Sequence, residues 1–244
     1  FCSFELAPRR ALSPAPAPHA ANMREGSETL PPPPSTRLPL QAPASLSEAQ
    51  RVLYDQVVAG AKDATGKPLK TRVDPATDGL LGPFNAMLLS PQLGRQLVGL
   101  ADCLRFGDLA ISQRSAEVVI LYLARLHCAE YPFWSHTKIG KAAGLSDETV
   151  EALRLGRRPP TLEPDEAAAL DLATALLEGS GGGEAVSDDA YRAAVQVLGE
   201  RGVFEIVTLT GFYTTLARVV NAFRVPVPTG EPRPFEGGPP ASRL

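Results

Sequence analysis

Cysteine and histidine are scarce in this chain of 244 residues, which contains three of each. The cysteines are Cys2, Cys103 and Cys128, which are too few and too scattered for a disulfide framework or a zinc site. With so few histidines, a His/Cys metal centre would have to collect its ligands from distant positions. We therefore expect no metal ion and no other cofactor.

The chain also lacks an excess of either charge, since 24 Lys and Arg are spread among 27 Asp and Glu. Because no basic face is clustered, nucleic acid is not an expected partner. No apolar run reaches the about 18 residues that a membrane span requires. The length and the hydrophobic content of 44% suit one good core. We expect a soluble, cytoplasmic protein with no membrane partner.

The start of the sequence is unusual because it opens on Phe1, while the first methionine is Met23. We expect Met23 to be the natural start, in which case residues 1–22 are not native. An organellar transit peptide is the alternative, because the early arginines come with few acids.

Both ends of the chain are rich in residues that do not build a core. Residues 1–45 are rich in Pro and Ala, include four consecutive prolines at 31–34, and lack apolar periodicity. We expect them to form a disordered tail, with a polyproline ligand for a partner as a less favoured alternative. The Pro- and Gly-rich residues 229–244 are expected to be loose.

Between these ends, apolar residues recur at helical spacing and no segment alternates with period two. We expect an all-α domain over residues 46–228, with a capping box of Ser45 and Glu48 at its first helix. Serines at 112, 146 and 187 and prolines at 91, 132 and 164 mark further helix starts. The remaining expected helices are 83–89, 91–106, 113–128, 132–143, 147–155, 164–178, 188–198 and 203–223.

The most informative stretch is 117–145, where an apolar helix carrying Glu117 leads through a short polar break into a helix carrying His136. A carboxylate among so many apolar residues is expected to be buried and must be paired or hydrogen-bonded. From the residues alone, a salt bridge to Arg114 or Arg125 is as good an interpretation as a catalytic role. A lone histidine on an amphipathic helix is likewise more often a core residue than a catalyst.

The spacing of Glu117, Tyr131 and His136 resembles the carboxymuconolactone decarboxylase and alkyl hydroperoxidase D (AhpD) superfamily. The core of that superfamily is a helical hairpin with a Glu on the first helix and a Tyr and a His opening the second. DGLLGPFNAMLLSPQLGRQLVGLADCLRF (78–106) is similar to its first helices, and GFYTTLARVVNAFRVPVP (211–228) to its closing helix. The resemblance implies a compact multi-helix AhpD-like domain that forms a homo-oligomer.

The peroxidase branch of the superfamily has a C-x-x-C pair around the tyrosine, and these two positions are Ala129 and Pro132 here. A two-thiol cycle needs one thiolate to attack the peroxide and a second thiol to resolve the sulfenic acid. Cys128 lies one residue off the pattern, a rotation of about 100° on a helix. The resemblance therefore supports the fold and the Glu/Tyr/His set, argues against disulfide chemistry, and leaves Cys128 as a low-ranked redox candidate.

By the same resemblance, the expected reaction is cofactor-free decarboxylation of a carboxylated lactone or a similar small acid. His136 would return a proton to carbon, Glu117 would orient it, and Tyr131 with the second helix's N-terminus would stabilise the oxyanion. If Pro132 starts that helix, free N–H groups at Phe133 and Trp134 would favour a carboxylate ligand. Phe133, Trp134 and Asn85 are the expected substrate-binding residues, and Tyr213 is expected at the same cavity.

Two rival functions stay open at this point. One is a thiol-dependent hydroperoxide reductase that uses Cys128 alone with an external thiol. The other is a non-catalytic oligomer of the same fold that binds small carboxylates, because a fold does not imply a function.

Overall fold

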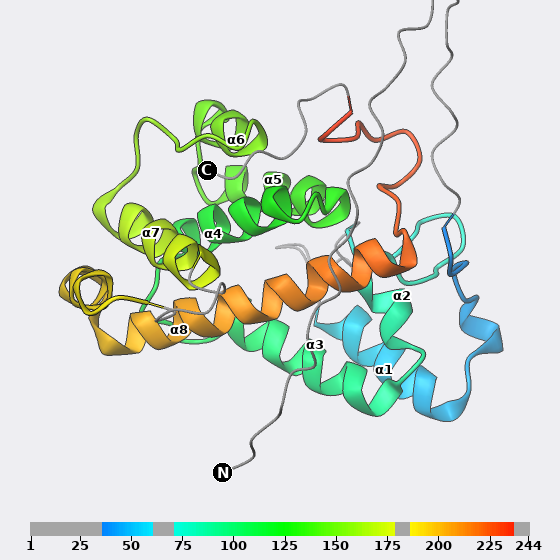
Figure 1. Ribbon diagram of the computed structural model, residues 1–244. Coiled ribbons are helices and arrows are strands. Elements are labelled where there is room, and N and C mark those ends of the chain that lie inside the picture. Colours follow the sequence, from blue (N-terminus) through cyan, green and yellow to red (C-terminus); the bar gives the residue numbers. More distant parts are fainter. Residues whose placement is uncertain (1–35, 61–70, 179–185, 237–244) are drawn as a thin grey trace, which may run out of the picture. The chain divides into compact units, whose positions relative to one another are not determined.

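The computed structural model describes residues 36–60, 71–178 and 186–236, and these form an all-α domain (Figure 1). Their only β pairing is an isolated bridge between Val73 and Leu80. The helices are α1 (Glu48–Ala59), α2 (Pro83–Met87), α3 (Pro91–Phe106), α4 (Gln113–Leu126), α5 (Glu130–Ala142), α6 (Asp147–Arg154), α7 (Pro164–Glu178) and α8 (Asp188–Phe223). The all-α prediction is confirmed, while Cys2 and the prolines at 31–34 lie outside the described residues.

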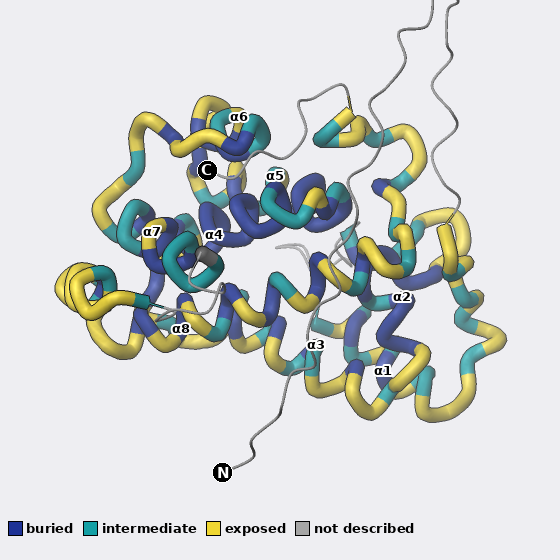
Figure 2. The backbone as a smooth tube through the Cα atoms, viewed as in Figure 1, coloured by how far each residue is buried: buried dark blue, intermediate teal, exposed yellow. Residues whose placement is uncertain are grey.

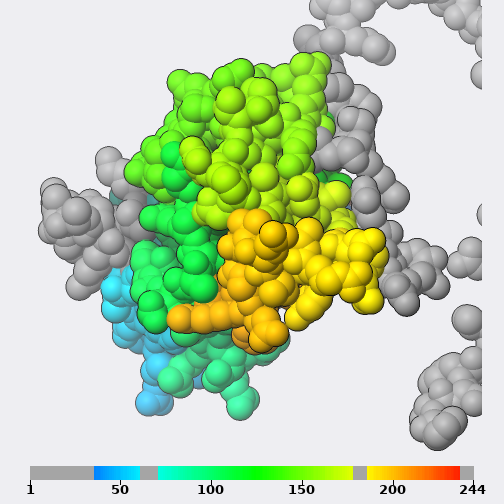
Figure 3. All heavy atoms as spheres, turned by 90° about the vertical axis from the view of Figure 1, so that its left-hand side faces the viewer, coloured from blue at the N-terminus to red at the C-terminus, as the bar shows by residue number. Residues whose placement is uncertain are grey.

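Helix α4 lies at the centre of the packing, against α5, α6, α7 and α8. Every residue from Ser115 to Arg125 is buried, and Figure 2 shows this helix in the colour of buried residues. The Ser112 side chain caps its start by accepting from the Ser115 N–H, as the sequence predicts. Figure 3 shows α7 and the first part of α8 covering one face of the molecule. The apolar sequence of α4 thus follows from its burial on all sides.

Helix α8 is the longest helix of the described chain, with 36 residues and a break at Gly199, whose φ is 69° and ψ is 167°. The break lies next to the gap between the predicted helices 188–198 and 203–223. By length and composition alone, α8 is long and apolar enough to cross a membrane, with an 18-residue window of mean hydropathy 1.3. The sequence did not predict this, because polar residues interrupt the window. Because 56% of that window is buried inside the protein, the helix has the pattern of a core helix.

Two helix starts differ from their predicted positions. The capping box of α1 is formed by Ser47 and Gln50, because Ser45 ends a short 3-10 helix, Pro43–Ser45, one turn earlier. Helix α5 begins at Glu130, two residues before Pro132, and the Phe133 N–H donates to the Ala129 carbonyl at 3.2 Å. Proline is tolerated in the first turn of a helix as well as at its first position, so it marks a start only approximately.

The residues next to the two ends are packed, contrary to the expectation of loose tails. Asn85 donates to the Pro39 carbonyl at 3.1 Å and accepts from the Gln41 N–H at 3.2 Å. At the other end, the Trp134 indole N–H donates to Glu231 at 2.9 Å. Composition predicted disorder because these segments bury little apolar area, whereas polar groups of the core hold them in place.

Candidate functional site

Glu117 and His136 face each other across the hairpin of α4 and α5. The Glu117 Oε2 atom lies 2.7 Å from His136 Nδ1, and both side chains are buried. Gly140, one turn after His136, lies against Glu117 of α4 and against Leu145, since a Cβ there would lie 3.5 Å from Glu117 Cβ and 2.8 Å from Leu145 Cδ1. The proposed salt bridge to Arg114 is not formed, because Arg114 Nε pairs with Glu166 Oε1 at 2.5 Å. The guanidinium of Arg125, the other candidate partner, lies over the ring of Phe235.

This contact determines how His136 can exchange protons. With Nδ1–H donating to the carboxylate, the neutral ring presents Nε2 as an acceptor, and a proton on Nε2 makes an imidazolium paired with Glu117. No described residue forms a hydrogen bond with Nε2. The ring can therefore act as a base or as an acid towards a bound molecule.

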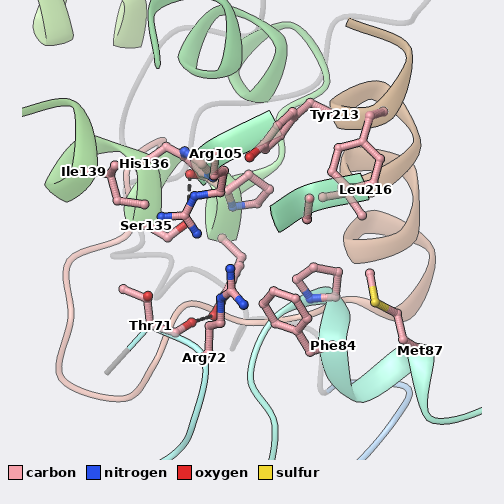
Figure 4. Close-up of a pocket in the computed structure, with 15 residues that line it drawn as sticks. Thr71, Arg72, Phe84, Met87, Arg105, Ser135, His136, Ile139, Tyr213 and Leu216 are labelled. Atoms are coloured by element: carbon pink, nitrogen blue, oxygen red, sulfur yellow. Dashed lines mark hydrogen bonds between the residues drawn. The ribbon is translucent and has the colours of Figure 1, made fainter. Parts of the chain in front are cut away.

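His136 lines a small cavity of about 50 Å³, whose walls come from α2, α3, α5, α8 and the segment before α2. That volume admits only a small molecule or a small part of a larger one. Figure 4 shows His136 and Tyr213 at one end of it and Arg72 and Phe84 at the other. Its lining residues are Thr71, Arg72, Pro83, Phe84, Met87, Ala101, Arg105, Tyr131, Pro132, Ser135, His136, Ile139, Phe212, Tyr213 and Leu216.

Tyr213 comes to the cavity from α8 and packs edge-on against His136, with ring centroids 5.1 Å apart. Burial and, to a smaller extent, the negative charge of Glu117 raise the pKa of the Tyr213 phenol. The phenol therefore stays protonated at neutral pH and can donate a hydrogen bond. Its place at the cavity agrees with the resemblance stated above.

Comparison with known proteins adds evidence on the fold. No family model matches the sequence, and no curated protein matches it significantly. A solved structure from Ralstonia eutropha, named as an AhpD core of an uncharacterized peroxidase-related protein, is similar with a TM-score of 0.61 and 15% identity. The match covers 80% of this chain and 94% of that one.

The chain has the AhpD-like fold. A second solved structure agrees: a protein of unknown function from Agrobacterium tumefaciens, described as a candidate AhpD antioxidant defence protein. Its TM-score is 0.53 at 19% identity, over 59% of this chain and 97% of that one. Identities this low establish the shared fold alone, so the chemistry has to be argued from the site itself.

Within this AhpD-like fold, Tyr131 lines the cavity, but its hydroxyl is already engaged. It donates to the Thr71 carbonyl, and its ring lies against Gly82, where a Cβ would overlap it. Gly82 has a φ of 63°, which also favours glycine there. Tyr131 therefore holds the segment before α2 in place, and the expectation of a free oxyanion donor is wrong for this state of the protein.

The second expected oxyanion element, the N-terminus of α5, is not at the expected place either. Because α5 starts at Glu130, the Phe133 N–H is used within the first turn. Phe133 packs edge-on against Phe235, and Trp134 binds Glu231 and lies beneath the Lys138 ammonium. Asn85 holds the segment before α1. None of these three expected substrate-binding residues lines the cavity.

The two described cysteines also lie away from His136. Cys128 follows α4 with a φ of 50° and is exposed, and Cys103 is exposed on α3. Neither lines the cavity.

Sequence reasoning missed the two arginines of the cavity. Arg72 lies outside every helix that the sequence predicts, and Arg105 lies at the end of α3. No periodic pattern distinguishes either one from a surface arginine. Only the packing of the segment before α2 against α5 brings Arg72 to the same cavity as His136.

A second cavity, of about 110 Å³, borders Glu117 at the N-terminal end of α4. Arg105, Ser112, Gln113 and Ala116 are among its lining residues. Its lining contains both polar and apolar side chains, and its volume is enough for water.

Proposed function

We propose that this protein catalyses cofactor-free decarboxylation, or closely related acid–base chemistry, on a small carboxylated lactone or a similar acid. The observation that carries the proposal is the buried pair of Glu117 Oε2 and His136 Nδ1, 2.7 Å apart beside a cavity. A histidine held by a buried carboxylate is a common arrangement for general acid–base work.

In the proposed reaction, the bond between the substrate and its carboxylate carbon breaks and carbon dioxide leaves. The electron pair of that bond enters the conjugated system and makes an enolate. The His136 imidazolium then gives its Nε2 proton to carbon, and it regains a proton from water. Glu117 orients the ring and stabilises its charged form throughout.

The Tyr213 phenol, with its raised pKa, is the donor that we assign to the enolate oxygen in place of Tyr131. A donor that is already in place when negative charge develops lowers the barrier without reorganisation. Tyr131 instead acts through the segment that it holds, so it is a positioning residue.

The hydroperoxide reductase remains the main alternative in the same fold, and the names of the two neighbouring structures are equally consistent with it. It would require a thiolate within reach of His136. The described cysteines, Cys103 and Cys128, do not line the cavity, so we rank this alternative second.

The test is to measure turnover of 4-carboxymuconolactone. Turnover is monitored through the loss of ultraviolet absorbance and the release of carbon dioxide. We expect His136→Ala to lower kcat by about 100-fold or more. His127→Ala is the matched control, because His127 lies outside the cavity, and it should keep wild-type turnover. Equal activity of the wild type and His136→Ala would refute the assignment. Peroxide consumption that is lost in Cys128→Ser would support the alternative instead.

A further inference from the structure

Arg72 is buried to an extent that is unusual for an arginine, with 2% of its surface exposed. It lines the cavity that His136 faces. None of its three guanidinium nitrogens has a hydrogen-bond partner among the described residues. A buried charged group normally has its donors satisfied, so these free donors need an explanation.

The groups around Arg72 compensate its charge only in part. Arg72 forms a loose ion pair with Asp102, whose buried Oδ1 atom lies 3.5 Å from Nη2 and, like the Arg72 nitrogens, has no closer hydrogen-bond partner among the described residues. The guanidinium also lies over the Phe84 ring, 4.9 Å from its centroid. Burial and the positive charge of Arg105 lower the pKa of Arg72, and Asp102 acts in the opposite direction. An arginine nevertheless stays protonated in proteins, so the cavity retains a positive charge.

The side chains at the surface of the cavity include cations but no acids, while Asp102 and Glu117 lie behind them, paired with Arg72 and His136. Arg72, Arg105 and His136 line the cavity, and the described lining residues include no Asp or Glu. Figure 4 shows Arg72 and Arg105 extending into the space between the ends of the cavity. The remaining wall is mostly apolar, with Phe84, Met87 and Leu216 among its members. Positive charge at a small apolar cavity fits an organic anion.

We propose that Arg72, supported by Arg105, is the subsite for a carboxylate group of the ligand, whose apolar body packs against Phe84, Met87 and Leu216. A guanidinium fork matches a carboxylate with two parallel hydrogen bonds, which would satisfy the free donors of Arg72. The inference that this ligand is the substrate rests on the proposed function.

The charge of Arg72 also indicates which carboxylate it holds. A carboxylate that departs as carbon dioxide loses its negative charge in the transition state, so a cation bound to it would stabilise the ground state more. A carboxylate that persists in the product keeps its charge, so Arg72 can bind it with the same strength in the substrate, the transition state and the product. The subsite therefore selects acids that retain a carboxylate after the reaction, and it places their reactive carbon towards His136.

Binding can be tested without any reaction by titrating propionate and its neutral analogue propionamide at constant ionic strength. Calorimetry should show that propionate binds the wild type at least about tenfold more tightly than propionamide. Arg72→Met should lose this preference, and Arg72→Lys should keep part of it. Arg95→Met is the matched control, since Arg95 is exposed on α3 outside the cavity, and it should bind propionate as the wild type does.

The thermal unfolding of Arg72→Met without ligand separates binding from a structural role. Because Arg72→Met leaves the buried Asp102 Oδ1 atom without its ion-pair partner, we expect Tm to fall, and Arg72→Lys, which keeps a cation there, to lose less. Loss of the propionate preference in a variant that is still folded then reports on binding. If Arg72→Met does not fold, Arg72→Lys alone decides, through its weaker preference for propionate. The proposal is overturned if the wild type does not prefer propionate to propionamide, or if the Arg72 variants bind propionate as the wild type does.

The same titration separates this inference from the proposed reaction. His136→Ala should bind propionate within about twofold of the wild type, because Arg72 carries the subsite. Retained propionate binding in a protein that turns over no carboxylated lactone would overturn the reaction and leave the subsite in place. Turnover that requires His136 but is unchanged in Arg72→Met would support the proposed reaction and overturn the Arg72 subsite.

Discussion

At the scale of single residues, the site depends on which partners its buried polar side chains have. Burial of the Glu117 carboxylate without a partner would cost free energy, and His136 Nδ1 is a partner at 2.7 Å. The apolar residues around Glu117 predicted that its carboxylate would be buried, and the resemblance to the superfamily implied that it would orient His136. The residues alone could not decide between His136 and Arg114 as the partner, since helix rotation and the position of α7 determine where Arg114 points.

His127 provides a residue-scale prediction on the pH dependence of stability. Its Nε2 atom is buried without a hydrogen-bond partner among the described residues, and burial, with the charge of Arg218, lowers the pKa of His127. The unfolded chain therefore binds this proton more readily than the folded one. The contribution of neutral His127 is present above the unfolded pKa of about 6.5 and is lost as the pH falls through the lower folded pKa.

We expect the free energy of unfolding of the wild type to decrease more between about pH 7.5 and pH 5 than that of His127→Gln. Urea denaturation of both proteins at several pH values measures the difference. Parallel pH profiles for the two proteins would show that His127 titrates alike in the folded and unfolded chains.

At the scale of helices, capping and periodicity determined most boundaries. Helices α3 and α7 have the predicted limits, and Ser112, Ser146 and Ser187 cap α4, α6 and α8 as expected. The start of α5 was misplaced because Pro132 is compatible with several positions in a first turn. That small shift changed the chemistry, since it removed the expected anion site at the Phe133 N–H.

The break in α8 leads to a prediction at this scale, with two glycines as a matched pair. A Cβ at either Gly199 or Gly211 would meet nothing within 4 Å, but Gly199 has a φ of 69° while Gly211 is helical. We expect Gly199→Ala to lower the free energy of unfolding by about 1–3 kcal/mol through backbone strain. Gly211→Ala should raise it by about 0.5–1 kcal/mol, because alanine is the better helix former.

Urea denaturation of the two variants beside the wild type gives both values. Because neither methyl group has a neighbour, packing cannot explain an opposite result. Stabilisation by Gly199→Ala would mean that α8 runs straight through residue 199 in solution.

At the scale of the whole molecule, residues 229–236 pack against α5, the helix that carries His136. Residues 229–236 contact α5 through Glu231 and Arg233, which bind Trp134 and Glu130 at 2.9 Å each. Phe235 lies 5.0 Å from Phe133, ring centroid to ring centroid. Trp134 in turn packs against Tyr131, which lines the cavity. The end segment is thus connected to the site through two aromatic residues.

A chain that ends at Pro228 should therefore lose stability and expose Trp134. We expect a decrease of at least about 1 kcal/mol in the free energy of unfolding and a red shift of the fluorescence of Trp134, the single tryptophan of the chain. A chain ending at Glu236 keeps all of these contacts and is the control. If truncation at Pro228 left the emission unchanged, the packing of this segment on Trp134 would be excluded.

The sequence by itself determined the helical class and most helix limits, because helical periodicity and caps act over a few neighbouring residues. Its resemblance to the AhpD superfamily implied the hairpin of Glu117 and His136. The tertiary structure alone decided which side chains share the cavity. It brought in Arg72, Arg105 and Tyr213 and left out Asn85, Phe133 and Trp134. Such contacts join segments far apart in the chain, and they depend on helix rotation and close approach at Gly82 and Gly140. No local pattern records these contacts.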